Sequence, residues 1–407
     1  MHRIDRRSVL RTGAAALIPT RLRPASTSPI DEALRSGIER RKIPCAVAMV
    51  AGPDRTLYAG AFGVRDTSRV PARIDSIFQI ASMTKAITTV AALQLVEQGR
   101  VGLDDPVAKY LPEFENIQVL GGYDSGGNPV LRPPATPPTL RHLVTHTSGL
   151  CYDYWDGDKF RYVSKHKPKP GMPGPLMFDP GKRWQYGQGL DWTGSLIEAL
   201  TKMTLEEYFQ AKILKPLKMD DTSYILPASK FDRAVSVYGR ASAGAELKQE
   251  ERKPPSPPKS FNGGGGLYST AADYVRFMQM ILNGGAGPNG VRILRKETVD
   301  EMKKNQIGSA TASKMKSYRP AWSSDVDVQP GHDEKWTLAF LMNTDPYDGG
   351  RSAGSLAWAG LLNTFYWIDP KRNLCAVILM QFLPFVDKEA VGLLNDFERA
   401  VYAAKLT

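Results

Sequence analysis

The clearest periodic pattern in the chain lies between residues 81 and 99, in the stretch ASMTKAITTVAALQLVEQG. Its apolar residues recur at steps of three and four, and Gly99 follows the last of them. This spacing predicts an amphipathic α-helix that ends at the glycine. The first turn of this helix carries Ser82 and Lys85, which the apolar stripe does not explain.

Further patterns lie near both ends of the chain. Residues 29–43 and 388–405 predict helices, and residues 45–66 predict two strands around a Gly-Pro-Asp turn. Three more short strands are expected in WTLAFLMN, LLNTFYWIDP and LCAVILMQF, at residues 336–343, 361–370 and 374–382. Strands at both ends of the chain favour one sheet to which both ends contribute.

The middle of the chain is richer in helical patterns, and one of them opens with a capping box at Thr204 and Glu207. Long loops are expected at residues 121–138, 164–181 and 243–266. We therefore predict an α+β fold: an antiparallel sheet flanked by helices, plus a mostly helical insertion domain. The sheet domain takes residues 26–110 and 259–407, and the insertion takes residues 111–258. The active site is expected in the cleft between them.

The N-terminal stretch at residues 1–25 is treated separately. Arg6 and Arg7 precede a short alanine-rich apolar segment, which resembles a twin-arginine export signal. A periplasmic or secreted protein is the expectation, and a cytoplasmic protein with a basic N-terminus is the alternative. No apolar run approaches the roughly 20 residues that a membrane span needs, so none is predicted.

Composition narrows the function classes. The 407 residues include 42% hydrophobic ones, enough for a large core, and the formal net charge is +11. Basic residues are mixed with acidic ones and form no arginine-rich helix, so no nucleic-acid function is predicted. The three cysteines, Cys45, Cys151 and Cys375, lack the spacing of a disulfide framework or a zinc site. We expect no metal and no cofactor.

Ser82 and Lys85 are the strongest chemical signal in the chain. A helix N-terminus carries roughly half a positive charge, which disfavours an ammonium there and favours a neutral amine. Residues three apart share a helix face, so Lys85 can accept the Ser82 proton and make the hydroxyl a nucleophile. Backbone N–H groups at the same helix end can stabilise an oxyanion.

The four residues from Ser82 to Lys85 are also compatible with an alternative, in which Ser82 is an N-cap and Lys85 a surface residue. The pattern S-x-x-K occurs four times in the chain, and only the one at Ser82 opens an apolar helix. No G-x-S-x-G motif is present, so a serine nucleophile of the α/β-hydrolase type is not expected.

Beyond this motif the chain resembles the serine β-lactamase-like superfamily, above all class C β-lactamases and family VIII carboxylesterases. Matching segments occur in the expected order across most of residues 30–400, among them FQIASMTKAITTVAALQLVEQG, LRHLVTHTSGL and AWAGLLNTFYWIDP. The resemblance implies a serine hydrolase that forms an acyl-enzyme without metal or cofactor.

The resemblance also implies roles for further residues. Tyr186, in the segment YGQ, stands at the tyrosine of the Y-x-N motif and would share the base role with Lys85. Gln188 stands where β-lactamases usually have Asn. Its side chain is one methylene longer, so the amide that would bind substrate is displaced relative to that of Asn. His146 would be structural, satisfying backbone groups in its loop. The glycines at residues 263–266 lack a following G-K-[ST], and a tight turn near the pocket is expected there.

The segment WAG at residues 358–360 stands where the family has K-T-G, on an edge strand beside the nucleophile. Gly360 would let substrate approach the strand, and the N–H of Leu361 would complete the oxyanion hole with that of Ser82. Trp358 replaces the cation that holds a β-lactam carboxylate, a contact worth roughly 1.5–3 kcal/mol. This replacement favours neutral esters over anionic antibiotics.

The sequence thus predicts a carboxylesterase that acts on small ester or amide substrates. A class C-like β-lactamase, a D-aminopeptidase or an acyltransferase would use the same residues and remain alternatives. A non-catalytic binding protein on the same scaffold is the alternative from another class. The sequence does not determine the oligomeric state or the physiological substrate.

Overall fold

The protein was analysed as a computed structural model, which describes residues 28–167, 169–242, 244–312 and 314–406. The predicted twin-arginine segment with Arg6 and Arg7 lies outside the described residues. Export therefore stays a prediction. No helix in the described part of the chain has the length and apolar character needed to cross a bilayer.

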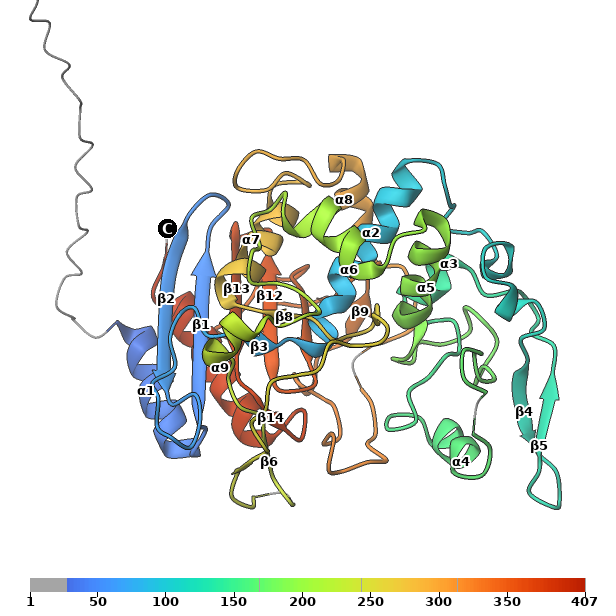
Figure 1. The fold of residues 1–407 in the computed structure, drawn as a ribbon, viewed down its shortest axis with the longest axis horizontal. Coiled ribbons are helices and arrows are strands. Elements are labelled where there is room, and N and C mark those ends of the chain that lie inside the picture. The colour runs from blue at the N-terminus through green and yellow to red at the C-terminus, as the bar shows by residue number, and fades with distance from the viewer. Residues whose placement is uncertain (1–27, 168, 243, 313, 407) are drawn as a thin grey trace, which may run out of the picture.

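The core of the fold is a seven-stranded sheet in which every neighbouring pair is antiparallel (Figure 1). In spatial order its strands are β2 (Thr56–Gly63), β1 (Cys45–Ala51), β13 (Leu374–Leu379), β12 (Thr364–Asp369), β11 (Leu356–Gly360), β10 (Leu341–Asn343) and β9 (Glu334–Trp336). Both ends of the chain contribute, which confirms the predicted α+β class.

The central strands are buried on both faces. Every residue of β1, β12 and β13 is buried, so these strands read as continuous apolar runs rather than as alternating ones. The helices that cover them are α1 (Pro29–Arg41), which packs against α9 (Lys388–Ala403), and α7 (Ala271–Leu282), which packs against β1 and β13. Cys45 and Cys375 lie in this core as free thiols, and Cys151 is also free and buried.

Two strands replace the single one expected at residues 336–343. A tight turn separates β9 from β10, closed by a hydrogen bond from Thr337 N to Phe340 O at 2.8 Å. The Thr337 hydroxyl also accepts the backbone N–H groups of Ala339 and Phe340. The apolar run therefore predicted burial correctly but missed the turn, because threonine is compatible with both a strand and a turn.

The helix predicted at residues 81–99 forms in two parts. A 3₁₀ turn, η1 (Ala81–Met83), precedes α2 (Thr84–Glu97), so Ser82 lies just before the α-helix and Lys85 in its first turn. The helix is not amphipathic in the expected sense, since every residue from Thr84 to Leu93 is buried. Its polar threonines are satisfied internally: Thr88 Oγ1, for example, donates to Gly263 O at 2.6 Å.

The middle of the chain contributes the helices α3 (Leu140–Val144), α4 (Gly157–Lys165), α5 (Gly189–Thr201) and α6 (Leu205–Phe209), with the predicted Thr204–Glu207 capping box confirmed at the start of α6. A hairpin of β4 (Val119–Tyr123) and β5 (Pro129–Arg132) stands where a loop was expected. The Asp124 carboxylate accepts the Asn128 N–H at 2.8 Å and closes this hairpin. Part of the middle of the chain, with α3, α4, α5, β4 and β5, lies on the right of Figure 1, whereas α6 lies nearer the centre.

Short elements complete the chain. They are η2 (Val107–Lys109), η3 (Pro112–Phe114), a π-helical turn η4 (Gln210–Leu214), η5 (Ala228–Arg233), α8 (Lys296–Met302), β3 (Phe78–Gln79) paired with β8 (Tyr268–Ser269), and β7 (Lys248–Gln249), β6 (Tyr238–Gly239) and β14 (Phe382–Leu383) in one small sheet. The small sheet ties residues 238–249 to the C-terminal part of the chain. The glycines at residues 263–266 form the predicted tight turn before β8 and α7.

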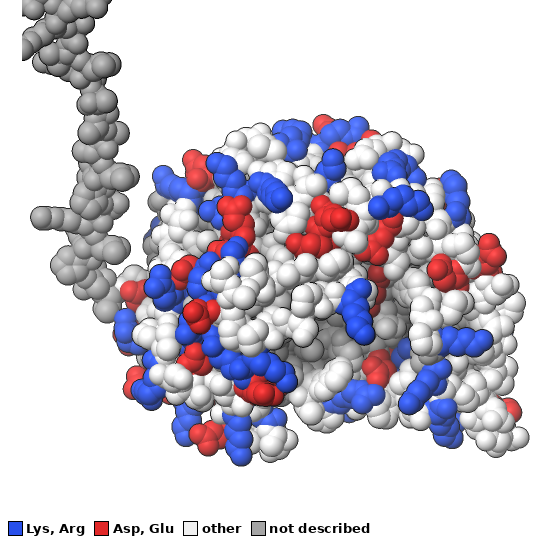
Figure 2. Space-filling view, viewed as in Figure 1, with Lys and Arg blue, Asp and Glu red and all other residues white. Residues whose placement is uncertain are grey.

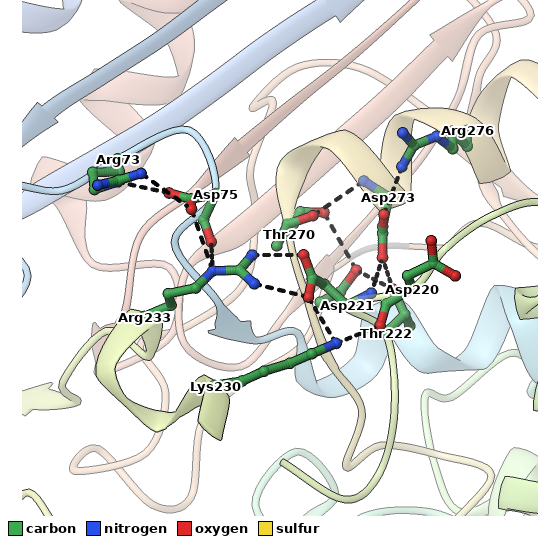
Figure 3. A network of polar contacts seen from close by, with 11 residues as sticks. Arg73, Asp75, Asp220, Asp221, Thr222, Lys230, Arg233, Thr270, Asp273 and Arg276 are labelled. Carbon is green, nitrogen blue, oxygen red and sulfur yellow. Dashed lines mark hydrogen bonds and ion pairs between the residues drawn. The ribbon is translucent and has the colours of Figure 1, made fainter. Parts of the chain in front are cut away.

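A polar network joins residues 220–233 to α7 (Figure 3). The Arg233 guanidinium makes a bidentate ion pair with Asp221 at 2.9 and 2.6 Å, and its Nε donates to the Asp75 backbone carbonyl at 2.9 Å. Asp273, in the first turn of α7, accepts the Asp221 N–H at 2.8 Å and the Thr222 hydroxyl at 3.0 Å. Burial raises the pKa of Asp273 to about 6. These contacts fix the segment that leads into the cavity wall at residues 224–226.

Charged residues of both signs are interspersed over the face shown in Figure 2, and no stripe of one sign crosses it. A nucleic-acid surface would show basic side chains gathered along one face. The visible face gives no support to that function class.

Candidate active site

Ser82 is held in a strained, partly exposed turn. The preceding residue, Ala81, has a φ of +42°, which a side chain with a Cβ seldom adopts. Strand β11 lies directly beside this turn. A Cβ on Gly360 would fall 2.4 Å from the Ile80 carbonyl oxygen, so the glycine lets β11 approach the serine-bearing segment. The space beside the Gly360 Cα is therefore filled by the protein's own backbone and is not open to substrate.

Lys85 is the centre of the site. Its Nζ lies 3.2 Å from Ser82 Oγ, 3.2 Å from the Tyr152 hydroxyl and 2.5 Å from the Gly264 carbonyl oxygen. The residue is only 2% exposed, which excludes a solvated surface lysine. Ser82 is no N-cap either, because the N-cap of α2 is Met83 and makes no side-chain capping bond. The Ser82–Lys85 contact predicted from the sequence is thus present.

Tyr186 also lies against Lys85. The Lys85 Nζ sits 4.9 Å from the centroid of its ring, and the phenol oxygen accepts a hydrogen bond from Trp358 Nε1 at 3.0 Å. Tyr186 and Trp358, predicted from two different motifs of the same family resemblance, are therefore direct partners. Both are buried. The indole orients the phenol, which leaves the phenolic proton free to point toward the reaction centre.

Tyr152 is a site residue that the sequence did not reveal. Its hydroxyl is hydrogen-bonded to Lys85 and its ring stacks on Tyr154 with centroids 5.0 Å apart. Burial raises the pKa of this phenol well above 10, so it stays protonated. A β-bridge between Cys151 and Gly187 brings Tyr152 beside Tyr186. Only this long-range pairing singles Tyr152 out from the other tyrosines in its segment.

Asp191, the third residue of α5, is the second residue that was missed. Burial raises the pKa of its carboxyl to about 6, against the positive charge of Lys85 and a hydrogen bond from Tyr152. A Cβ on Gly264 would fall 1.7 Å from Asp191 Oδ1, so only glycine fits there. An acidic residue in a first helical turn is ordinary. Nothing in its spacing connects it to Ser82.

His146 supports the tyrosine segment, as expected. Its Nδ1 accepts the Gly187 N–H at 3.3 Å, and its ring packs 4.4 Å from that of Tyr186. Burial, together with the charge of Lys85, lowers the pKa of the imidazole well below 6.5. The neutral ring is therefore a structural support and makes no contact with Ser82 among the described residues.

Two further predicted site residues, Gln188 and Leu361, lie at the ends of secondary-structure elements. Gln188 is the N-cap of α5, half-buried, and no hydrogen bond joins its side chain to Lys85 in the described part of the chain. Leu361 follows the end of β11, and its N–H donates none of the backbone bonds that link the described loops and turns. That amide is available for an oxyanion.

Strand β11 is interior in the sheet, not the edge strand that was expected. Its neighbour β10 pairs only with Leu356 and Ala357, however. On that side Trp358–Gly360 runs past the end of its partner. The WAG segment thus has a local edge beside the nucleophile, although the strand as a whole does not.

A cavity of about 490 Å³ is lined in part by Ala81, the residue that precedes Ser82. Ala81, Gly265 and Leu361 border it on the side of the nucleophile, and Leu226, Pro257 and Leu383 lie among its apolar walls. A space of this size accepts a drug-sized molecule. The site therefore combines a serine hydroxyl that is hydrogen-bonded to a buried lysine with a largely apolar cavity next to it.

Comparison with known proteins decides the family. The family model described as Beta-lactamase matches residues 30–400. This chain belongs to the beta-lactamase family. The predicted resemblance is confirmed, and the protein is an enzyme, a β-lactamase-related serine hydrolase.

Two curated members of the beta-lactamase family illustrate its relatives. The Monacolin J acid methylbutanoyltransferase of Aspergillus terreus is 31% identical over 93% of this chain and 97% of its own length. The Lovastatin esterase of Penicillium rubens is 31% identical over 86% of this chain and 89% of its own. The relatives thus include both an acyltransferase and an esterase.

Solved structures of the beta-lactamase fold agree. A Simvastatin Synthase variant from Aspergillus terreus superposes with a TM-score of 0.79 at 30% identity, covering 93% of this chain and 96% of its own. EstCE1, described as a hydrolase with promiscuous acyltransferase activity, gives a TM-score of 0.70 at 20% identity and shows the fold alone. The predicted antiparallel architecture is confirmed.

Proposed function

We propose that the protein is an acyltransferase, which forms an acyl-enzyme on Ser82 and passes the acyl group to an alcohol. The observation that carries this proposal is the buried Lys85 amine, hydrogen-bonded to the Ser82 hydroxyl, next to Ala81 in the lining of a 490 Å³ cavity. The transferase and the esterase are equally identical to this chain, but the transferase aligns with 93% of it and the esterase with 86%, which favours transfer over the simple ester hydrolysis that the sequence suggested. The transferase's name describes transfer of a methylbutanoyl group, and we propose that this protein likewise transfers a small acyl group.

The first half-reaction acylates the serine. Ser82 Oγ attacks the carbonyl carbon of the donor ester while its proton passes to Lys85 Nζ, which acts as the base. The N–H groups of Ser82 and Leu361 stabilise the oxyanion. The bond to the donor's leaving oxygen then breaks, and that oxygen takes a proton from the Lys85 and tyrosine cluster. The products are the acyl-enzyme and a free alcohol.

The second half-reaction reverses these roles. The acceptor hydroxyl attacks the acyl carbon, its proton goes to the Lys85 amine, and Ser82 Oγ leaves with a proton from the same cluster. Tyr186, oriented by Trp358, and Tyr152, bonded to Lys85, are the two phenols within reach of that transfer. Water in place of the acceptor gives hydrolysis, so an esterase activity accompanies transfer.

Hydrolysis as the main activity is the second candidate, since the esterase relative is as similar as the transferase. A β-lactamase activity has less support, because Trp358 stands in place of the family's cation. Its indole N–H donates a hydrogen bond to the Tyr186 hydroxyl. A β-lactam carboxylate would lack a charged partner at this strand.

Labelling with a fluorophosphonate tests the nucleophile. Intact mass should show one adduct, and peptide mapping should place it on Ser82. Ser82→Ala should take no label, whereas Ser164→Ala, in another S-x-x-K sequence of the chain, should label normally. An adduct on any other serine would refute the assignment.

The partition of one acyl-enzyme separates the two candidates. With 4-nitrophenyl butyrate as donor and a bulky primary alcohol as acceptor, mass spectrometry measures the new ester against butyric acid. Transfer should exceed hydrolysis at millimolar acceptor. Butyric acid as the sole product, with every acceptor tried, would favour an esterase instead.

A further inference from the structure

The wall of the cavity beside Ser82 has an unusual charge pattern. Among the described residues that line it, Glu250 is the only one with a formal charge, and none is Lys or Arg. The other walls are apolar side chains, prolines, glycines and neutral polar groups. Lys259, which lies between two lining residues, is itself exposed and outside the lining.

Glu250 is fixed by its backbone but carries no ion pair. Its N–H donates to the Val237 carbonyl at 2.8 Å, directly after β7. Nearby acidic residues are paired: Glu251 with Lys253 at 3.0 Å, and Asp66 with Arg65 at 3.2 Å. No salt bridge of the described residues involves Glu250, so its negative charge acts on whatever occupies the cavity.

We propose that this cavity binds the alcohol part of the substrate, and that Glu250 selects alcohols that are apolar and uncharged or cationic, against those that carry a carboxylate. This inference rests on the proposed function and names its substrate class. The volume supports the alcohol side, because 490 Å³ is far larger than a short acyl chain requires. Without a lining cation, an anionic alcohol would lose water contacts and gain a repulsive neighbour.

Three butyrate esters of nearly equal shape test this. The alcohol parts are 3,3-dimethylbutanol, choline, and 4-hydroxy-2,2-dimethylbutanoate, which replaces one methyl group of the neutral alcohol by a carboxylate. Butyrate release gives kcat/KM for each. The wild type should prefer the neutral and cationic esters to the anionic one, and raised salt should weaken that preference.

Glu250→Gln should reduce the neutral-to-anionic preference about two- to fivefold, the range expected for an exposed charge pair. It should leave the neutral ester nearly unchanged. Glu250→Lys should reverse the preference. Glu251→Gln removes the same charge one residue away, outside the lining, and should change the ratio little. Because ratios are compared within each variant, partial misfolding does not disturb the result.

Equal use of the anionic and neutral esters by the wild type, or an equal effect of the two glutamine variants, would overturn the inference. Turnover of the neutral ester in Ser82→Ala would instead overturn the proposed function. The two failures are therefore distinguishable.

Discussion

The cluster around Lys85 and the cavity wall near Glu250 differ in how they are built. The cluster is buried, aromatic and connected: the Lys85 Nζ alone contacts Ser82, Tyr152 and Gly264. On the side of Glu250 the wall consists largely of exposed loop residues, including prolines at residues 257 and 258. Reaction chemistry needs groups that do not move, whereas selection of a substrate needs only shape and charge. Substitutions in the Lys85 cluster should therefore abolish most of the activity, whereas most substitutions in the cavity wall should leave it nearly unchanged.

The sharpest test of this comparison removes the amine. Lys85→Met should lower kcat/KM for a neutral ester at least about 10⁴-fold, because the serine loses its base. Lys167→Met, in a second S-x-x-K sequence, is the matched control and should be near wild type. Steady-state kinetics with 4-nitrophenyl butyrate measures both. A mild loss in Lys85→Met would mean that the cluster is not the reaction centre.

The two phenols come next. Tyr152→Phe and Tyr186→Phe keep the ring and remove only the hydroxyl, and each should lower kcat about 10²-fold or more. Tyr154→Phe, on the stacked neighbour of Tyr152, should change it little. Burst kinetics would show which half-reaction slows. Wild-type rates in Tyr152→Phe would leave Tyr186 as the only phenol in the chemistry.

Asp191 should control the acid limb of the pH profile. Since the Tyr152 oxygen accepts from Lys85, its own proton must point elsewhere, and the ionised Asp191 carboxylate is the acceptor. Activity should therefore rise as the pH passes through about 6, the pKa of that carboxyl in the folded protein.

Asp191→Asn should lose this inflection and run about tenfold slower, since an amide oxygen accepts without a charge. The pH dependence of kcat/KM measures it. Persistence of the inflection in the variant would assign it to another group.

The smallest expected effect is on stability, at the network that fixes the cavity wall. Burial raises the pKa of Asp273 to about 6, above the value of about 4 in an unfolded chain. Because the pKa is raised in the fold, the contribution of Asp273 to the free energy of unfolding is present below pH 4 and is lost as the pH rises to 6.

Between pH 4 and 6 the free energy of unfolding should fall by about 1–2 kcal/mol more in the wild type than in Asp273→Asn. Urea titrations across that range measure the difference. Parallel curves for the two proteins would show that Asp273 ionises normally in the fold.

Much of the fold follows from the sequence alone. Apolar runs at both ends predicted the sheet, and the Thr204–Glu207 box predicted the start of α6, because burial and capping leave local patterns. The turn between β9 and β10 and the β4–β5 hairpin were missed. Their residues also suit a strand or a loop, and only pairing with distant segments decides between these.

The site divides in the same way. The sequence by itself predicted that Ser82 and Lys85 meet, because residues three apart along a helical segment lie close together wherever that segment lies. Only the tertiary structure decided that this lysine is buried, that Tyr152 binds it and that Asp191 stands behind them. Those contacts join segments about 70 to 180 residues apart, and closing such distances depends on the packing of the whole chain.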